Sequence, residues 1–78
     1  MTRRTQLDAL ARDAFGPRAT VDTERVSRTG CDVTWVAEVW CGGRFELAVE
    51  RRTRPAVTEA LADVLRGVVA RRRGTVAA

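Results

Sequence analysis

Two runs of alternating apolar and polar residues flank the pair Gly42-Gly43, and this pattern restricts the fold more strongly than any other feature of the chain. Residues 32–41 and 44–51 each repeat with a period of two, which is typical of strands that bury one face. Because glycine tolerates the positive φ angles of tight turns, the pattern predicts an antiparallel hairpin. The larger apolar set falls on the face that contains Trp35, hereafter the Trp35 face: Val33, Trp35, Ala37, Val39, Cys41, Phe45, Leu47 and Val49.

The register of this hairpin has two interpretations. With a two-residue Gly42-Gly43 turn, Val39 lies opposite Glu46, which mixes apolar and charged side chains on one face. A three-residue loop, 41–43, keeps every pair on the Trp35 face apolar, so burial favours it, with Gly43 supplying a positive φ angle at a bulge. The expected pairs are Val39 with Phe45, Ala37 with Leu47, Trp35 with Val49, Glu38 with Glu46, and Trp40 with Arg44, the last as a cation–π contact.

The segments before the hairpin predict one helix and one strand. Residues 6–15 carry apolar side chains at helical spacing, with Thr5 as the expected N-cap and Gly16-Pro17 as the stop. Residues 19–27 favour extended chain, and their charged side chains suit an edge strand. A turn over 28–32 connects this strand to the hairpin.

The segment after the hairpin predicts a second helix. We expect it to begin near Pro55, with Thr53 or Arg54 as its cap. Gly67 lowers the helix propensity, and residues 74–78 are expected to fray beyond the arginines of the last turn. The apolar stripe consists of Val57, Leu61, Val64, Leu65 and Val68, and Ala60 widens it.

The expected order is therefore α-β-β-β-α, in an α+β two-layer sandwich. The three strands form an antiparallel sheet, and both helices cover its Trp35 face. The opposite face, which contains Trp40 and is hereafter the Trp40 face, stays open. With 78 residues the chain has room for one small domain, 1–78, whose ordered core spans about 5–72.

The residue types argue against catalysis and against a metal site. The chain has no His and no Lys, which removes the usual acid–base and nucleophilic side chains. Two cysteines cannot complete a four-ligand zinc site, and Cys31 and Cys41 bracket one strand, too far apart for a disulfide. Glu38, Glu46 and Glu50 share the Trp40 face without a visible cleft. We expect a protein that is not an enzyme, with reduced thiols and no cofactor.

All 14 basic residues are arginine, and the net charge is +4. The isoelectric point near 10.9 is typical of nucleic-acid-binding proteins. The joint absence of Lys, Asn, Ile and Tyr also indicates a GC-rich genome, such as that of an actinobacterium or one of its phages, in which arginine is the default cation. No apolar run approaches the length of a membrane span, and the first residues do not resemble a signal peptide, so we expect a cytoplasmic protein without membrane contact.

Arg51, Arg52 and Arg54 gather at the expected start of the last helix. Cations there oppose the helix dipole, whereas cations together with free backbone N–H groups favour phosphate. The alternative is that Arg51 and Arg52 form ion pairs with Glu50 and Asp32. The first interpretation predicts an anion site at the start of the helix.

The order of elements resembles the double-stranded-RNA-binding domain. Residues 33–65 are similar to the second half of that family: a hairpin, then basic residues, then an Ala-rich amphipathic helix. By this resemblance Thr53 stands where the family has Ser or Thr, Arg54 where it has its first motif lysine, and Ala60 at a core alanine. The resemblance implies that the start of the last helix grips phosphates across a major groove, while the first helix and the loop between the first two strands enter minor grooves.

The match to that motif is partial. Pro55 and Thr58 occupy its two other basic positions, and the loop 27–32 lacks the family's His. The basic ends of the chain, including Arg3-Arg4, are either weak contacts to nucleic acid or solvated tails. The candidate nucleic-acid-binding residues are Arg51, Arg52, Arg54, Arg28, Arg71, Arg72 and Arg73.

The Trp40 face offers a second hypothesis, a protein-interaction module. Val36, Trp40 and Arg44 on an uncovered face form the kind of aromatic and arginine patch that is enriched in interfaces. The partner is then another protein, as for a small adaptor or inhibitor, or a second copy in a homodimer. Otherwise Trp40 is packed by Arg44 or covered by one of the chain's tails.

Overall fold

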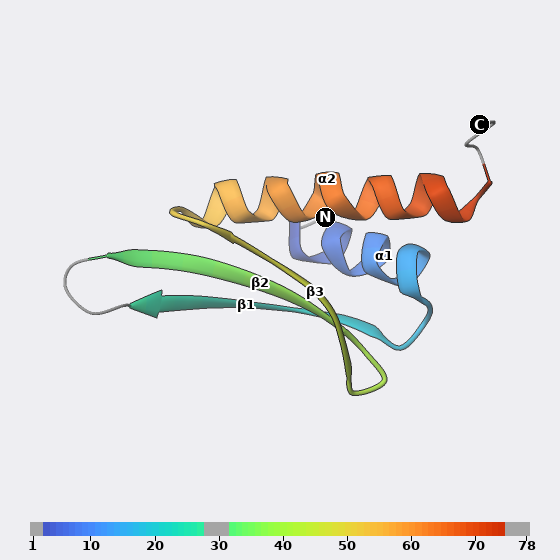
Figure 1. Cartoon of the computed structure of the whole chain (residues 1–78), viewed down its shortest axis with the longest axis horizontal. Helices are drawn as coiled ribbons and strands as arrows, with labels where there is room; N and C mark the ends of the chain where they lie inside the picture. Colours follow the sequence, from blue (N-terminus) through green and yellow to red (C-terminus); the bar gives the residue numbers. More distant parts are fainter. Residues whose placement is uncertain (1–2, 28–31, 75–78) are drawn as a thin grey trace.

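Two helices lie on one face of a three-stranded antiparallel sheet in the computed structural model, which describes residues 3–27 and 32–74 (Figure 1). The strand order β1-β2-β3 makes the sheet a meander. This arrangement confirms the predicted α+β fold and its α-β-β-β-α order. The elements along the chain are α1 (Arg3–Phe15), β1 (Ala19–Ser27), β2 (Val33–Cys41), β3 (Arg44–Arg51) and α2 (Arg54–Arg72).

The core lies between the helices and the Trp35 face, as the alternation predicts. Trp35, Leu47 and Val49 are partly buried against it. No polar or charged side chain of the described residues is buried, so the side chains of the core make apolar contacts. The fully buried residues come from both helices and from β1 and β2: Leu7, Ala11, Ala14, Ala19, Val21, Ala37, Val39, Val57, Leu61 and Leu65.

The predicted hairpin register is wrong, because the turn and a bulge act together. Cys41 pairs with Arg44, so the turn has two residues, Gly42 and Gly43, with φ angles of 59° and 84°. This turn geometry matches the right-handed twist of the strands. The pairing then shifts by one residue between Trp40 and Val39, and Glu46 has no partner residue in β2.

Beyond the bulge, every second side chain of β2 and β3 again faces the core. Val39 pairs with Leu47 and Ala37 with Val49, so the apolar side chains of β2 and β3 meet on the Trp35 face. Glu38 therefore lies opposite Ala48 rather than opposite Glu46. The bulge satisfies the burial constraint for which the sequence pattern predicts a longer loop.

The bulge also moves Phe45 to the other side of the sheet. Phe45 pairs with Trp40, and the two rings meet edge to face with centroids 5.5 Å apart. Its exposed fraction is 48%, so its predicted burial on the Trp35 face is wrong. The predicted pairing of Trp40 with Arg44 is also wrong, because Arg44 lies opposite Cys41 and forms an ion pair with Glu46 at 3.6 Å.

The first helix begins earlier than predicted. It starts at Arg3, so Thr5 lies inside α1 and is not its N-cap. The Arg4 side chain donates a hydrogen bond to the carbonyl of Val21 and lies 3.8 Å from Asp8, which ties this additional turn to β1. The helix ends as predicted, with Gly16 at a φ of 115°.

The last helix buries most of the predicted stripe, since Val57, Leu61 and Leu65 are buried and Val68 packs against the core. Val64 is 39% exposed, whereas Ala62 and Val69 pack against the core. The reason is that α2 packs against α1 as well as against the sheet, which turns its buried side towards α1. Gly67 does not end the helix, which continues to Arg72.

Cys41 is a free thiol that donates a hydrogen bond to the carbonyl of Phe15 at 3.4 Å. Cys31, the turn 28–31 and the tail 75–78 lie outside the described residues. Neither described helix is long and apolar enough to cross a bilayer.

Two glycine substitutions test the turn and the helix in opposite directions. Gly43→Ala is expected to lower the free energy of unfolding by about 1–2 kcal/mol, because a side chain is strained at positive φ. No atom lies within 4 Å of the added Cβ, so the cost is conformational. Gly67→Ala, inside α2, is expected to raise it by about 1 kcal/mol. Urea denaturation measures both, and a neutral Gly43→Ala would contradict the turn geometry.

Candidate functional site

The sheet separates its charged side chains by sign near the β1–β2 connection. Arg25 pairs with Trp35, and Trp35 pairs with Arg51, so the three residues form one row across β1, β2 and β3. Since side chains alternate, both arginines share the Trp35 face, whereas their neighbours Glu24 and Glu50 lie on the opposite face. The end of the Trp35 face is therefore basic.

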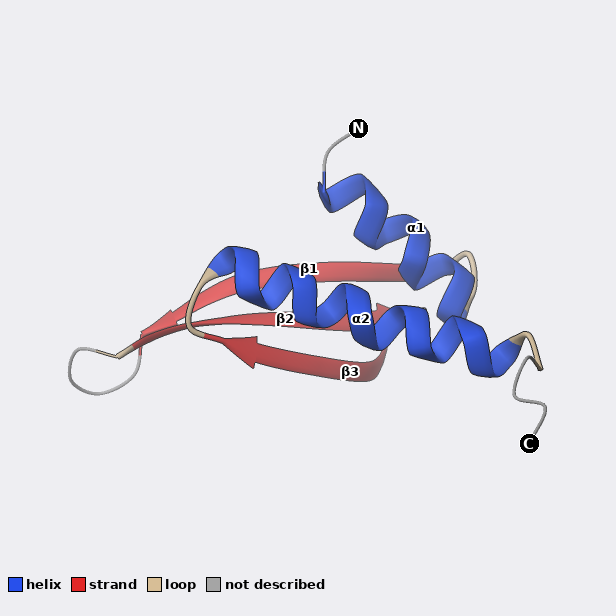
Figure 2. Ribbon diagram, turned by 90° about the horizontal axis from the view of Figure 1, so that it is seen from above, coloured by secondary structure: helices blue, strands red, loops and turns tan. Residues whose placement is uncertain are grey.

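The first residue of α2 completes this basic group. The Arg54 guanidinium lies 5.7 Å from the centroid of the Trp35 ring, a cation–π contact. Figure 2 shows why they meet: α2 runs along the sheet, and its first turn lies above the strands near this end. Arg25, Arg51 and Arg54 thus surround one half-buried indole, and we call these four residues the Trp35 cluster.

Thr53 positions the start of this helix, as predicted. The backbone N–H of Ala56 donates to the Thr53 hydroxyl at 3.2 Å, and the backbone at Thr53 is extended, as an N-cap requires. No acidic residue occupies the first turn of α2. The positive end of the helix dipole is therefore not offset locally and adds to the field of the arginines.

The arginines of the cluster have no acidic partner within the described part of the chain. Arg25, Arg51, Arg52 and Arg54 are all exposed, and no described carboxylate lies within ion-pair distance of any of them. Arg51 donates instead to the backbone carbonyl of Glu50, at 2.6 Å. The ion pairs considered for Arg51 and Arg52 are not formed, so the guanidinium groups keep donors for an external anion.

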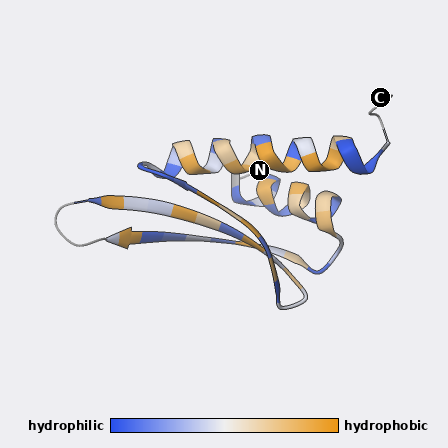
Figure 3. Cartoon of the chain, viewed as in Figure 1, coloured by the Kyte–Doolittle hydropathy of each residue, from blue (hydrophilic) through white to orange (hydrophobic). Residues whose placement is uncertain are grey.

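The arginines at the end of α2 contact the protein itself. Arg71 donates to the carbonyl of Gly67, Arg72 donates to the carbonyl of Ala14, and Arg73 lies 3.8 Å from Asp13. Figure 3 shows this end as a strongly hydrophilic segment. At a rise of about 1.5 Å per residue, Arg72 is about 27 Å from Arg54 along the helix, so the two basic groups are separate. Arg28 lies outside the described residues.

On the Trp40 face the structure brings together only part of the predicted patch. Val36 and Trp40 lie on this face and are half-buried. Arg44, opposite Cys41, does not face Trp40. The aromatic neighbour of Trp40 is Phe45, which alternation alone assigns to the other face.

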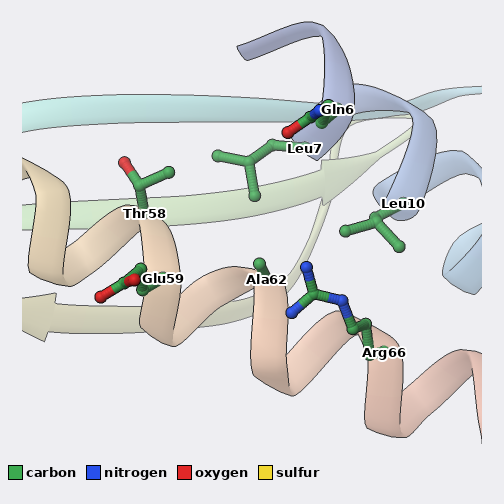
Figure 4. Close-up of a pocket in the computed structure, with 7 residues that line it drawn as sticks. All are labelled: Gln6, Leu7, Leu10, Thr58, Glu59, Ala62 and Arg66. Carbon is green, nitrogen blue, oxygen red and sulfur yellow. The ribbon is translucent and has the colours of Figure 1, made fainter. Parts of the chain in front are cut away.

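More than one hollow lies between the two helices. One has a volume of about 350 Å³ and is lined by Leu10, Asp13, Arg66, Val69, Ala70 and Arg73. Another is a groove, shown in Figure 4, whose volume of about 180 Å³ is below the usual range of small-molecule pockets. Arg66 at its rim already pairs with Asp63 at 3.1 Å. No cluster of three or more metal-ligating side chains occurs among residues 3–27 and 32–74. The groove is lined by Gln6, Leu7, Leu10, Thr58, Glu59, Ala62 and Arg66.

Sequence reasoning missed Arg25 as a member of the site. The sequence does contain a signal for it, because Arg25 and the buried Val21 are four residues apart in one strand. Side chains separated by an even number of residues share a face of the strand, so Arg25 belongs to the Trp35 face. Its position beside Trp35 follows only from the pairing of β1 with β2, which the sequence does not specify.

No family model, curated protein or solved structure matches this chain in comparison.

The N-cap at the Trp35 cluster gives a stability prediction. Thr53→Ala removes the acceptor for the Ala56 N–H and is expected to cost about 1 kcal/mol of unfolding free energy. Thr53→Ser keeps an acceptor and is expected to cost less than half as much. Equal losses in the two variants, measured by urea denaturation, would show that the hydroxyl does not cap the helix.

Proposed function

We propose that this chain is a small non-enzymatic module that binds the phosphates of a nucleic acid through Arg51, Arg52 and Arg54, joined by Arg25. The observation that carries the proposal is the Trp35 cluster itself. Its exposed guanidinium groups meet at a helix start and have no carboxylate partner among the described residues.

The chemistry of the cluster favours phosphate. Guanidinium presents paired N–H donors that match two phosphate oxygens, and it stays charged at every physiological pH. Arg25 and Arg51 lie on strands two positions apart, which separates them by about 10 Å. Cations spread over that distance suit successive phosphates of a polyanion better than one small anion.

The resemblance to the double-stranded-RNA-binding domain supports duplex RNA as the first ligand to test. In that family the start of the last helix contacts phosphates, and Thr53 and Arg54 match its motif. Pro55 and Thr58 do not, since they supply no cation. In this proposal Arg25 and Arg51, on the strands, provide the charge that those two positions lack.

The test is a salt titration of binding to a labelled RNA duplex of about 20 base pairs, long enough for a site of about 16. The variant Arg25→Gln/Arg51→Gln/Arg54→Gln is expected to weaken binding and to flatten the slope of log affinity against log salt. If all three side chains contact phosphates, the slope falls by about 2–3.

A charge-matched control separates this site from general basicity. Arg18→Gln/Arg44→Gln/Arg66→Gln removes the same charge outside the cluster and outside the first helix, and is expected to retain most of the affinity and slope. Thermal unfolding verifies that both variants are folded. Equal losses in the two variants, or no binding of duplex RNA or DNA by the parent chain at low salt, would refute the proposal.

A further inference from the structure

The Trp40 face is acidic along most of its length. Asp22 pairs with Glu38, while Glu24 and Glu50 both pair with Val36, so four carboxylate side chains share this face across three strands. The helices cover only the opposite side of the sheet (Figure 1). None of the described arginines of the strands belongs to this face: Arg25 and Arg51 lie on the Trp35 face, and Arg44 is opposite Cys41.

An aromatic pair ends this acidic face at the hairpin. Trp40 and Phe45 meet at 75° with centroids 5.5 Å apart. Phe45 is 48% exposed, although it is among the largest apolar side chains of the chain. Glu38 is two residues from Trp40 on the same strand face, a spacing of about 7 Å. Carboxylates beside exposed aromatic rings recognise cationic groups in two ways, by ion pairing and by cation–π contact.

The negative charge of the Trp40 face determines which kind of partner it can bind. A face-to-face homodimer brings the carboxylates of Asp22, Glu24 and Glu38 in the two copies together, which like-charge repulsion opposes. A nucleic acid or an anionic membrane is repelled in the same way. A cationic polypeptide is the complementary partner.

We infer that the Trp40 face binds an extended basic segment of a partner protein. Side chains on one face of an extended peptide repeat every 7 Å or so, which matches the step from Trp40 to Glu38 along β2. One arginine or lysine of the partner lies against Trp40 and Phe45, and the next pairs with Glu38 and Asp22. This surface is separate from the Trp35 cluster, on the opposite side of the sheet, and does not depend on the proposed function.

The probe is a fluorescein-labelled peptide of about eight residues in which arginine alternates with serine, so that its cations share one face when extended. Fluorescence anisotropy measures its affinity for the parent chain and variants. Asp22→Asn/Glu38→Gln is expected to weaken binding about tenfold, and Phe45→Ala about threefold. Glu59→Gln/Asp63→Asn, on α2, removes the same charge elsewhere and is expected to leave the affinity within twofold of the parent.

Two further measurements separate this surface from the others. The Arg25→Gln/Arg51→Gln/Arg54→Gln variant is expected to bind the peptide as the parent does, while Asp22→Asn/Glu38→Gln leaves affinity for duplex RNA undiminished. Light scattering is expected to show a monomer without peptide. Each of three results would overturn the inference: no peptide binding at low salt, equal losses in the α2 control, or a dimer that Phe45→Ala dissociates. The last result would assign the face to a second copy.

Discussion

Contact between the helices and one face of a three-stranded sheet is the constraint on which the rest of this structure depends. The buried set contains many small side chains, among them Ala11, Ala14 and Ala37. Small residues let the helices and the sheet approach closely. A strand that turned its other face to the helices would therefore bring side chains that do not fit between the two layers. Once the odd-numbered residues of β1 and β2 point to the helices, the positions of the charged side chains on the strands follow.

The sequence predicts the elements well because each has a clear period and clear end signals. Strands β1 and β3 have the predicted bounds, and Thr53 caps α2. The register near the hairpin does not follow from the alternating pattern alone. Burial favours apolar pairs on the Trp35 face, whereas the twist of the strands favours a two-residue turn, and a bulge at Glu46 satisfies both. Val64 is exposed for a similar reason: which side of α2 is buried depends on α1, a tertiary neighbour that a stripe does not specify.

The candidate site is predicted only in part, for the same physical reason. Arg51, Arg52 and Arg54 are adjacent in the sequence, so a local reading finds them. Arg25 joins them through cross-strand pairing, which is a long-range property. The arginines at the end of α2 look equivalent in the sequence, yet they bind α1 and α2 themselves. The arginines at the end of α2 lie within reach of acceptors on the two helices. The arginines of the Trp35 cluster have no described carboxylate within ion-pair distance, so they are left to bind an external anion.

The bulge at Glu46 has a consequence for how this chain can vary in length. An inserted or deleted residue in a regular strand reverses inside and outside for everything beyond it. Here the bulge separates the hairpin turn, Gly42-Gly43, from the rest of β3. Its unpaired residue, Glu46, restores the alternation of inward and outward side chains on the far side of the bulge. Homologous chains can therefore differ by one residue at this tip and still deliver Leu47 and Val49 to the interior, while the identity of the solvent-facing aromatic changes.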